Sequence, residues 1–283
     1  MQKRHTTARV GVVLLAAGAL WLYATRTHTE RRLDSAASAP GPAVDTAANI
    51  RRDAGRLSMS MATEEQVGFS EPPGSGLNAQ YGIDVVVLAH NRPASLSRLL
   101  DSLSAAHYRS RPPTVEIMID GADAAVHRVA RKWRWQSKEI VTRTVSAGLR
   151  EAWLGALSGK SKSGYWIIFE DDLTVSPKWH SWLSSAWAAY GGRADLAGIS
   201  LQRQTLIPQN PSKHAEIVNA HMPYLYKLVG SIGFSPHPTR WQEFLAWVGT
   251  KNLTTFDARV EGLVTSDWYN KLNKKSMWTQ LFI

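Results

Sequence analysis

Three carboxylates follow one another directly after a short apolar run. Glu170, Asp171 and Asp172 come after residues 166–169, whose β-branched and aromatic side chains are typical of a central strand in a parallel sheet. Neighbouring carboxylates repel one another unless a cation or solvent compensates, and ligands of open α/β sheets bind beyond the carboxyl ends of the strands. Hard oxygen ligands suit Mn²⁺ or Mg²⁺, and Mg²⁺ is usually held by one or two carboxylates together with substrate phosphates. The three acids therefore predict a metal-assisted site for a nucleoside diphosphate.

The alternative for these acids is a solvated turn before the next helix. Ser176 and Pro177 are suited to the N-cap and the first position of that helix, so the acids are not needed as caps. We therefore favour the functional interpretation. The helix after Pro177 carries an aromatic stripe at helical spacing, which predicts a core face rather than a sugar platform. Its members are Trp179, Trp182, Leu183, Ala186, Trp187 and Tyr190.

Composition narrows the class of protein. With 283 residues, 44% of them hydrophobic, the chain can bury a full core. A net charge of +10 suits an anionic membrane face or phosphorylated substrates as well as nucleic acid, and the basic residues are spread along the chain, with nine of the 33 before residue 80, so a nucleic-acid groove is not expected. The absence of cysteine excludes disulfides, thiolate metal sites and a cysteine nucleophile.

The N-terminal region has the pattern of a targeting segment. An uncharged apolar run at 10–24 follows Lys3, Arg4 and Arg9, which favours a cytoplasmic N-terminus. We interpret 1–9 as a cytoplasmic tail, 10–25 as an uncleaved signal anchor and 26–80 as a flexible stem rich in small and charged residues. A cleaved signal peptide is the alternative for the apolar run. The anchor predicts a single-pass type II membrane protein in the Golgi or another secretory compartment.

Residues 81–283 alternate between strand and helix patterns. This order predicts an α/β fold with a mostly parallel sheet flanked by helices. The less regular stretch 202–222 is long enough for a substrate loop, and the apolar end of the chain leads us to expect further structure beyond Ile283. Strands are expected at 83–89, 115–119, 140–144, 166–169, 196–201 and 225–234, the last of them interrupted by Gly230 and Gly233. Helices are expected after Pro93, at 122–135, 149–157 and 239–248, and from Ser266.

Several common catalytic motifs are missing. The stretch 155–161 has three residues between its glycines where a phosphate loop needs four, and it follows a helix pattern. Neither an HExxH zinc motif nor a G-x-S-x-G elbow occurs. The dinucleotide fingerprint is absent after the first strand, where residues 90–93 read His-Asn-Arg-Pro.

The order of features from residue 83 onward resembles the GT-A glycosyltransferases, most closely the inverting N-acetylglucosaminyltransferases that build complex N-glycans. The specific part is 167–177, which is similar to that family's strand, Glu-Asp-Asp metal motif and following proline. The resemblance implies a UDP-sugar donor, a glycan or glycoprotein acceptor, and Mn²⁺ or Mg²⁺ as the metal. It also implies that transfer inverts the configuration at the anomeric carbon of the sugar. The chain departs from the family at Asn91, where an aspartate is usual, and in lacking the family's cysteines.

The resemblance also implies roles for individual residues. Asp172 would ligate the metal, and Glu170 and Asp171 would contact the ribose, the sugar or metal-bound water. Arg92 would lie near the nucleotide, and Asp120 would bind the uracil. Residues 229–234 look like the glycine-rich strand beneath the donor sugar. Asp267, in a Thr-Ser-Asp-Trp segment, would be the catalytic base.

Alternatives remain for the residues and for the protein. Arg150 either reaches the diphosphate or is a solvated helix charge, and Asp267, with Ser266 as N-cap, would also suit the first turn of any helix. A nucleotidyltransferase would use a similar fold and metal. Such an enzyme would normally be cytosolic, so the predicted anchor makes this alternative less favoured. A membrane-tethered carbohydrate-binding protein without catalytic activity is the alternative outside enzymes.

Overall fold

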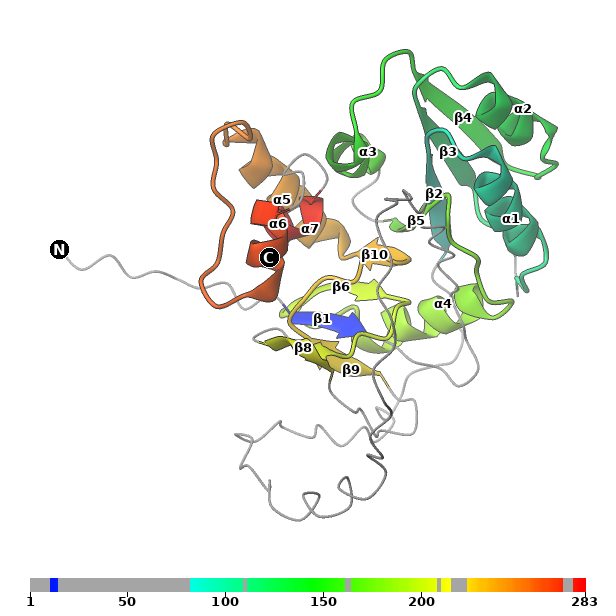
Figure 1. The fold of residues 1–283 in the computed structure, drawn as a ribbon. Helices are drawn as coiled ribbons and strands as arrows, with labels where there is room; N and C mark the ends of the chain where they lie inside the picture. Colours follow the sequence, from blue (N-terminus) through cyan, green and yellow to red (C-terminus); the bar gives the residue numbers. More distant parts are fainter. Residues whose placement is uncertain are drawn as a thin grey trace, which may run out of the picture. The chain divides into compact units, whose positions relative to one another are not determined.

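The computed structural model describes residues 11–14, 82–108, 111–160, 164–207, 210–214, 223–271 and 277–283. Within these residues the chain forms a sheet of eight strands with helices packed against it (Figure 1). The predicted α/β class with a mostly parallel, helix-flanked sheet is confirmed.

The first half of the sheet is parallel and the second half is mixed. β4, β3, β2 and β5 are parallel neighbours, whereas β10 runs antiparallel between β5 and β6. β1 is parallel to β6, and β9 is antiparallel to β1. In spatial order the strands are β4 (Lys138–Arg143), β3 (Val115–Asp120), β2 (Ile83–Ala89), β5 (Tyr165–Glu170), β10 (Phe234–Pro236), β6 (Leu196–Ser200), β1 (Gly11–Leu14) and β9 (Tyr224–Tyr226). A second, two-stranded sheet pairs β7 (Leu206–Ile207) with β8 (Asn210–His214).

Seven helices accompany the sheet among the described residues. They are α1 (Pro93–Ser104), α2 (Ala124–Lys132), α3 (Leu149–Ala156), α4 (Trp179–Tyr190), α5 (Pro238–Gly249), α6 (Val264–Lys271) and α7 (Trp278–Phe282). One hydrophobic cluster joins the sheet to α1, α2 and α4, and a second joins it to α3, α5, α6 and α7.

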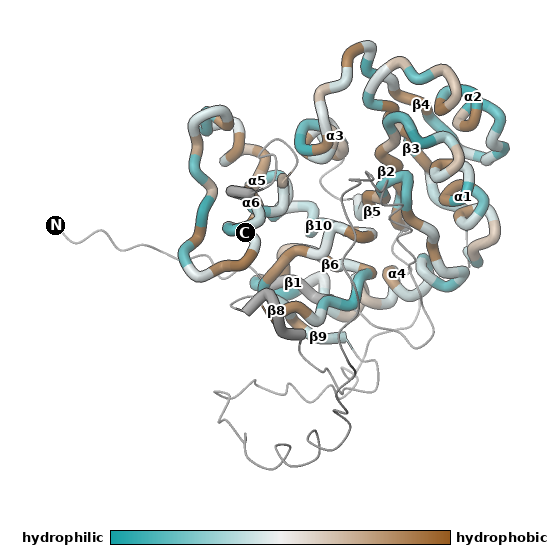
Figure 2. Tube along the Cα trace, in the orientation of Figure 1, coloured by the Kyte–Doolittle hydropathy of each residue, from teal (hydrophilic) through white to brown (hydrophobic). Residues whose placement is uncertain are grey.

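β2 shows why the central strands are apolar at nearly every position. Val85 and Val87 belong to the first cluster and Val86 to the second, and all three are fully buried. A strand covered on both faces has no solvent side, so it does not alternate between polar and apolar residues. Figure 2 shows hydrophobic residues concentrated along such strands and hydrophilic residues on the outer side of α2.

The predicted helix faces are confirmed as core. The four leucines of α1 are at most 1% exposed, and each buried leucine contributes about 1.5–3 kcal/mol. The aromatic stripe of α4 is also core: Trp179 and Trp187 are buried, and Trp182 and Tyr190 pack against the same cluster. The stripe is therefore not a sugar platform.

Several predicted boundaries are wrong. α4 begins at Trp179 rather than after a cap at Ser176, because residues 176–179 form a turn in which the Trp179 amide donates to the Ser176 carbonyl at 3.1 Å. α2 ends at Lys132 rather than at 135, and β4 begins at Lys138 rather than at 140. The strand predicted at 225–234 with interruptions at its glycines is divided into β9 and β10, and Gly233 adopts a φ of +66°.

The start of the last predicted helix is also wrong. α6 begins at Val264, and Ser266 does not cap it. The Ser266 hydroxyl instead accepts from the Val260 amide and donates to the Val260 carbonyl, each at 2.8 Å, so it holds the preceding turn.

The N-terminal predictions fall mostly outside the described residues. Of the predicted anchor at 10–25, only Gly11–Leu14 is described, and its backbone forms β1. The tail at 1–9 and the stem at 26–80 lie outside the described residues. No helix in the described part of the chain has the length and apolar character needed to cross a membrane. The anchor stays a prediction.

Candidate active site

The three acids lie where the sequence predicts them, at the carboxyl end of β5. Glu170 is the last residue of this strand and pairs with Leu88 of β2. The Asp171 amide continues the pairing by donating to the Leu88 carbonyl at 2.9 Å. The acids are thus held by the backbone of two central strands, at the edge of the sheet where α/β proteins bind ligands.

Arg92 bridges two of these acids from the turn between β2 and α1. Its Nη2 atom lies 2.5 Å from Asp171 Oδ1, and its Nη1 atom lies 2.7 Å from Asp172 Oδ2. The Asp171 side chain is 1% exposed, whereas those of Asp172 and Arg92 are 24% and 47% exposed. Burial lowers the pKa of Arg92, but the two carboxylates outweigh it and raise the pKa overall.

Asp171 is the buried member of this group. Burial raises its pKa, and Arg92 together with the His90 amide, 3.3 Å from Oδ2, offsets only part of the rise. The charge on Asp171 therefore depends on Arg92 staying close, because a buried carboxylate without a partner is costly.

Glu170 has a different environment. Its Oε1 atom accepts a hydrogen bond from the Trp153 indole at 3.1 Å. Burial, followed by the charge of Asp172, raises the pKa of Glu170 to about 7. At neutral pH this side chain is divided between its protonated and ionised forms, so it can donate a hydrogen bond as well as accept one. Carboxyl groups perturbed in this way are frequent at functional sites.

A cavity of about 440 Å³ opens beside Glu170 and Asp172. Its volume lies within the range of about 300–1,000 Å³ that is common for small-molecule sites. The remaining lining residues combine apolar walls with amide and hydroxyl groups. They are Leu173, Gln202, Gln204, Leu206, Leu228, Val229, Ser231, Ile232, Thr265, Trp268, Met277 and Thr279.

A larger cavity, of about 690 Å³, is bordered by β6, α5 and α7. The three carboxylates that line it, Asp195, Glu243 and Asp257, are each paired with an arginine two or three residues away. It holds no cluster of adjacent acids, so the smaller cavity beside β5 is the better candidate for metal-assisted chemistry.

The predicted glycine-rich segment forms one wall of the smaller cavity. A Cβ atom at Gly230 would lie 2.6 Å from Ser200 Oγ, and one at Gly233 would lie 3.1 Å from Phe169. Only glycine therefore allows this segment to pack so closely on the ends of β5 and β6. Val229 and Ser231 are thereby placed in the wall of the cavity.

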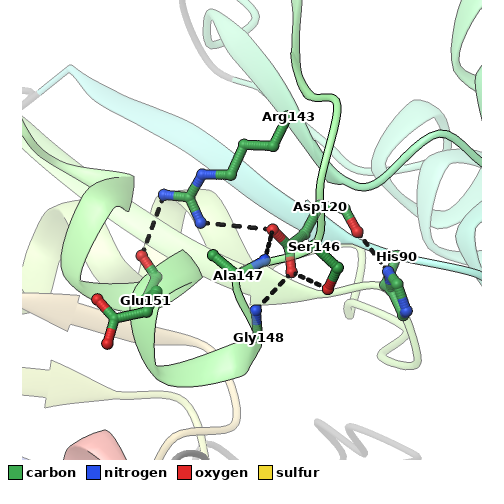
Figure 3. Close-up of polar contacts among 7 residues, drawn as sticks. All are labelled: His90, Asp120, Arg143, Ser146, Ala147, Gly148 and Glu151. Atoms are coloured by element: carbon green, nitrogen blue, oxygen red, sulfur yellow. Dashed lines mark hydrogen bonds and ion pairs between the residues drawn. The ribbon is translucent and has the colours of Figure 1, made fainter.

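The Asp120 carboxylate binds the loop of residues 146–148 (Figure 3), and Asp120 does not line the cavity. Its Oδ1 atom accepts from the Ala147 amide at 3.0 Å and from Arg143 at 3.5 Å. Its Oδ2 atom accepts from the Ser146 hydroxyl at 2.8 Å and the Gly148 amide at 2.9 Å. Burial alone would raise the pKa of Asp120, but these hydrogen bonds and the charge of Arg143 lower it overall.

We expect Asp120→Asn to lower the free energy of unfolding by about 1.5–3 kcal/mol, because an amide group would face donors that now bind a carboxylate. The folded-state pKa is lowered, so this stabilisation is fully present above about pH 4 and is lost as the pH falls through the folded-state pKa. Denaturant unfolding at pH 7 and pH 3 measures both effects. Asp101→Asn, at an exposed position on α1, is the matched control. Equal stability of the Asp120 and Asp101 variants at pH 7 would contradict the structural role.

Arg150 and Asp267 lie outside the lining of the cavity beside β5. Arg150 donates twice to Glu151 Oε1, at 3.0 and 2.8 Å. Asp267 is the fourth residue of α6 and is exposed, whereas its neighbours Thr265 and Trp268 line the cavity. The structure thus brings Arg92, Glu170, Asp171 and Asp172 together, and it leaves Asp120, Arg150 and Asp267 apart from the cavity wall.

Four residues of the site were not singled out from the sequence. His90 joins the ends of three strands, since its amide donates to Asp171 and its ring contacts the Asp120 carbonyl. Trp153 binds Glu170 from α3. Gln202 and Gln204 line the cavity. The signal for the glutamines was their place at the start of the predicted substrate loop.

The acids fit a metal ion that takes most of its ligands from a substrate. No group of three or more histidine, aspartate or glutamate side chains in the described ranges is placed to hold a metal by itself. Asp172 is partly exposed and lines the cavity, whereas Asp171 is almost fully buried. One carboxylate supplemented by phosphate oxygens and water is a common arrangement for Mg²⁺.

Comparison with known proteins gives distant structural likeness only. No protein-family model matches the chain, and no curated protein matches it in sequence. TarS of S. aureus (residues 1–349) matches 38% of this chain and 31% of its own length, with 17% identity and a TM-score of 0.33. The mannosyltransferase PcManGT of Pyrobaculum calidifontis, in complex with GDP-Man and Mn²⁺, matches 61% of this chain and 48% of its own length, with 12% identity and a TM-score of 0.43. Likeness at this level carries no conclusion about activity.

Proposed function

We propose that the protein is a metal-assisted glycosyltransferase that uses a nucleoside-diphosphate sugar as donor. The observation that carries the proposal is the junction at β5, where Glu170 and Asp172 line a cavity of ligand size and Arg92 lies against the acids. The donor is proposed to be a UDP-sugar, with N-acetylglucosamine as the first candidate. The acceptor is proposed to be a hydroxyl of a glycan or glycoprotein.

In this proposal the residues of the junction have separate tasks. Asp172 holds Mn²⁺ or Mg²⁺, which when bound stabilises the charge of the departing diphosphate. Arg92 supplies a second positive charge beside the phosphates. Glu170 lines the cavity and can bind a hydroxyl of the sugar or the ribose.

Asp267 is proposed as the general base on the acceptor side. Its exposed position keeps the carboxylate accessible to an arriving acceptor, and the adjacent Trp268 lines the cavity. The acceptor oxygen would attack the anomeric carbon from the side opposite the diphosphate, and Asp267 would take its proton. One carbon–oxygen bond forms as the bond to the diphosphate breaks, so the configuration at the sugar is inverted.

The predicted anchor at 10–25 would hold the transferase at a membrane, and residues 11–14 would then leave the pairing with β6 and β9 in which they form β1. We propose a Golgi or other secretory location on the basis of that apolar segment, with 26–80 as the stem that gives the catalytic domain reach.

The direct test is thermal unfolding with UDP and MnCl₂, separately and together. A ligand that binds only the folded state at 100 times its Kd stabilises it by about 2.7 kcal/mol. We expect the two ligands together to raise the Tm by more than the sum of their separate effects. A screen of UDP- and GDP-sugars for transfer and hydrolysis would then identify the donor. No joint effect on the Tm, and no turnover of any donor, would overturn the proposal.

A further inference from the structure

One arginine contacts both Asp171 and Asp172, and Asp172 is the proposed metal ligand. The guanidinium of Arg92 contacts Asp171 with one nitrogen and Asp172 with the other. We propose that Arg92 is a built-in counter-cation which keeps the site closed to metal until the donor arrives. This inference rests on the proposed function and adds to it an order of binding.

The first step concerns charge. A divalent ion approaching Asp172 in the absence of donor meets the positive charge of Arg92 and has to replace the contact at 2.7 Å. Like charges at such short range repel strongly where solvent is partly excluded. Mn²⁺ alone should therefore bind weakly, even though its carboxylate ligand is already in place.

The second step concerns the mobility of the guanidinium. The Arg92 side chain is 47% exposed, whereas Asp171 is buried and also accepts from the His90 amide. The arginine can therefore keep its contact with the buried acid while its other nitrogens turn toward the cavity. Guanidinium groups bind phosphate oxygens in the same forked geometry as carboxylates.

The third step is the exchange of partners. A diphosphate in the cavity offers Arg92 a new anionic partner, which frees Asp172 for the metal, and the metal binds the same phosphates. Metal and nucleotide should then increase each other's affinity by the same factor, as linkage requires. The metal therefore binds Asp172 tightly only after the nucleotide has drawn Arg92 away from it.

Calorimetric titration of Mn²⁺, with and without saturating UDP, tests this inference. We expect UDP to raise the Mn²⁺ affinity of the wild type at least tenfold. Arg92→Met should bind Mn²⁺ alone about tenfold more tightly than the wild type, a size typical of strong coupling between sites, and the factor by which UDP raises the Mn²⁺ affinity should be smaller by a similar amount, leaving the part that comes from the shared phosphates. Arg98→Met, at an exposed arginine on α1, should follow the wild type.

A second pair of variants covers the case in which Arg92→Met leaves Asp171 buried without a partner and the protein fails to fold. Asp171→Asn removes the buried charge, and the double variant Asp171→Asn with Arg92→Met then removes the arginine from a neutral background. The double variant should bind Mn²⁺ alone about tenfold more tightly than Asp171→Asn.

Two results would count against different claims. Equal Mn²⁺ affinity with and without Arg92, in a protein that still binds Mn²⁺ together with UDP, would overturn the role of Arg92 and leave the proposed function standing. Absence of Mn²⁺ binding from the wild type even with UDP would overturn the proposed metal site itself.

Discussion

Asp172→Asn is expected to abolish Mn²⁺-dependent binding of UDP, with a loss of at least about a hundredfold in affinity. The substitution removes a partly exposed carboxylate that lines the cavity, and with it the charge that holds the cation against the diphosphate. The Tm should change little, because a pair as exposed as Arg92 and Asp172 contributes about 0–1 kcal/mol. Calorimetric titration of UDP in MnCl₂ measures the first effect and thermal unfolding the second.

Asp171→Asn provides the comparison for this variant. Asp171 contacts Arg92 and does not line the cavity, so its loss should weaken UDP binding less than the loss of Asp172. If the Asp172 variant binds UDP in Mn²⁺ as tightly as the wild type, this residue is not a metal ligand.

Asp267→Asn is expected to slow sugar transfer at least a hundredfold while donor affinity stays unchanged. A general base contributes typically about 10²–10⁴-fold to a rate and is not needed to bind the donor. An exposed carboxylate in a helix affects stability by about 0.3–1 kcal/mol, so the Tm should remain near that of the wild type. Transfer has to be measured at saturating donor and acceptor, so that only the chemical step is compared.

The control for Asp267 is Glu261→Gln, which neutralises another exposed carboxylate just before α6. Glu170→Gln should be assayed beside it, because Glu170 lines the cavity and its pKa lies near neutrality. Transfer by Asp267→Asn within threefold of the wild type would return Asp267 to the role of a surface helix charge.

The position of the acids was predictable from the sequence because it depends on a local pattern. A buried strand followed by carboxylates places those carboxylates at one edge of the sheet, whatever the rest of the chain does. The burial of the leucines in α1 was predictable for the same reason, since helical periodicity alone determines the face.

The partners of the acids were less predictable. Arg92 lies about eighty residues before Asp171 and Asp172, and only the pairing of β2 with β5 brings them together. The same holds for Asp120, whose carboxylate could have faced a ligand but is saturated by residues 143–148. Sequence periodicity gives the edge of the sheet at which a side chain emerges, and tertiary packing decides which donors it meets.

The short antiparallel strand β10 has a consequence for how this protein could diverge. β6 and β10 are neighbours in the sheet, with Phe234 opposite Ser200, yet residues 201–233 lie between them in the chain. The described part of that excursion supplies much of the cavity wall, including Gln202, Gln204 and Val229. Because the register of β10 is fixed by its pairing with β6, the excursion can change in length and composition without moving the acids on β5. A chain with a different insertion at this place would line the cavity with other side chains, while the acids at the end of β5 keep their positions.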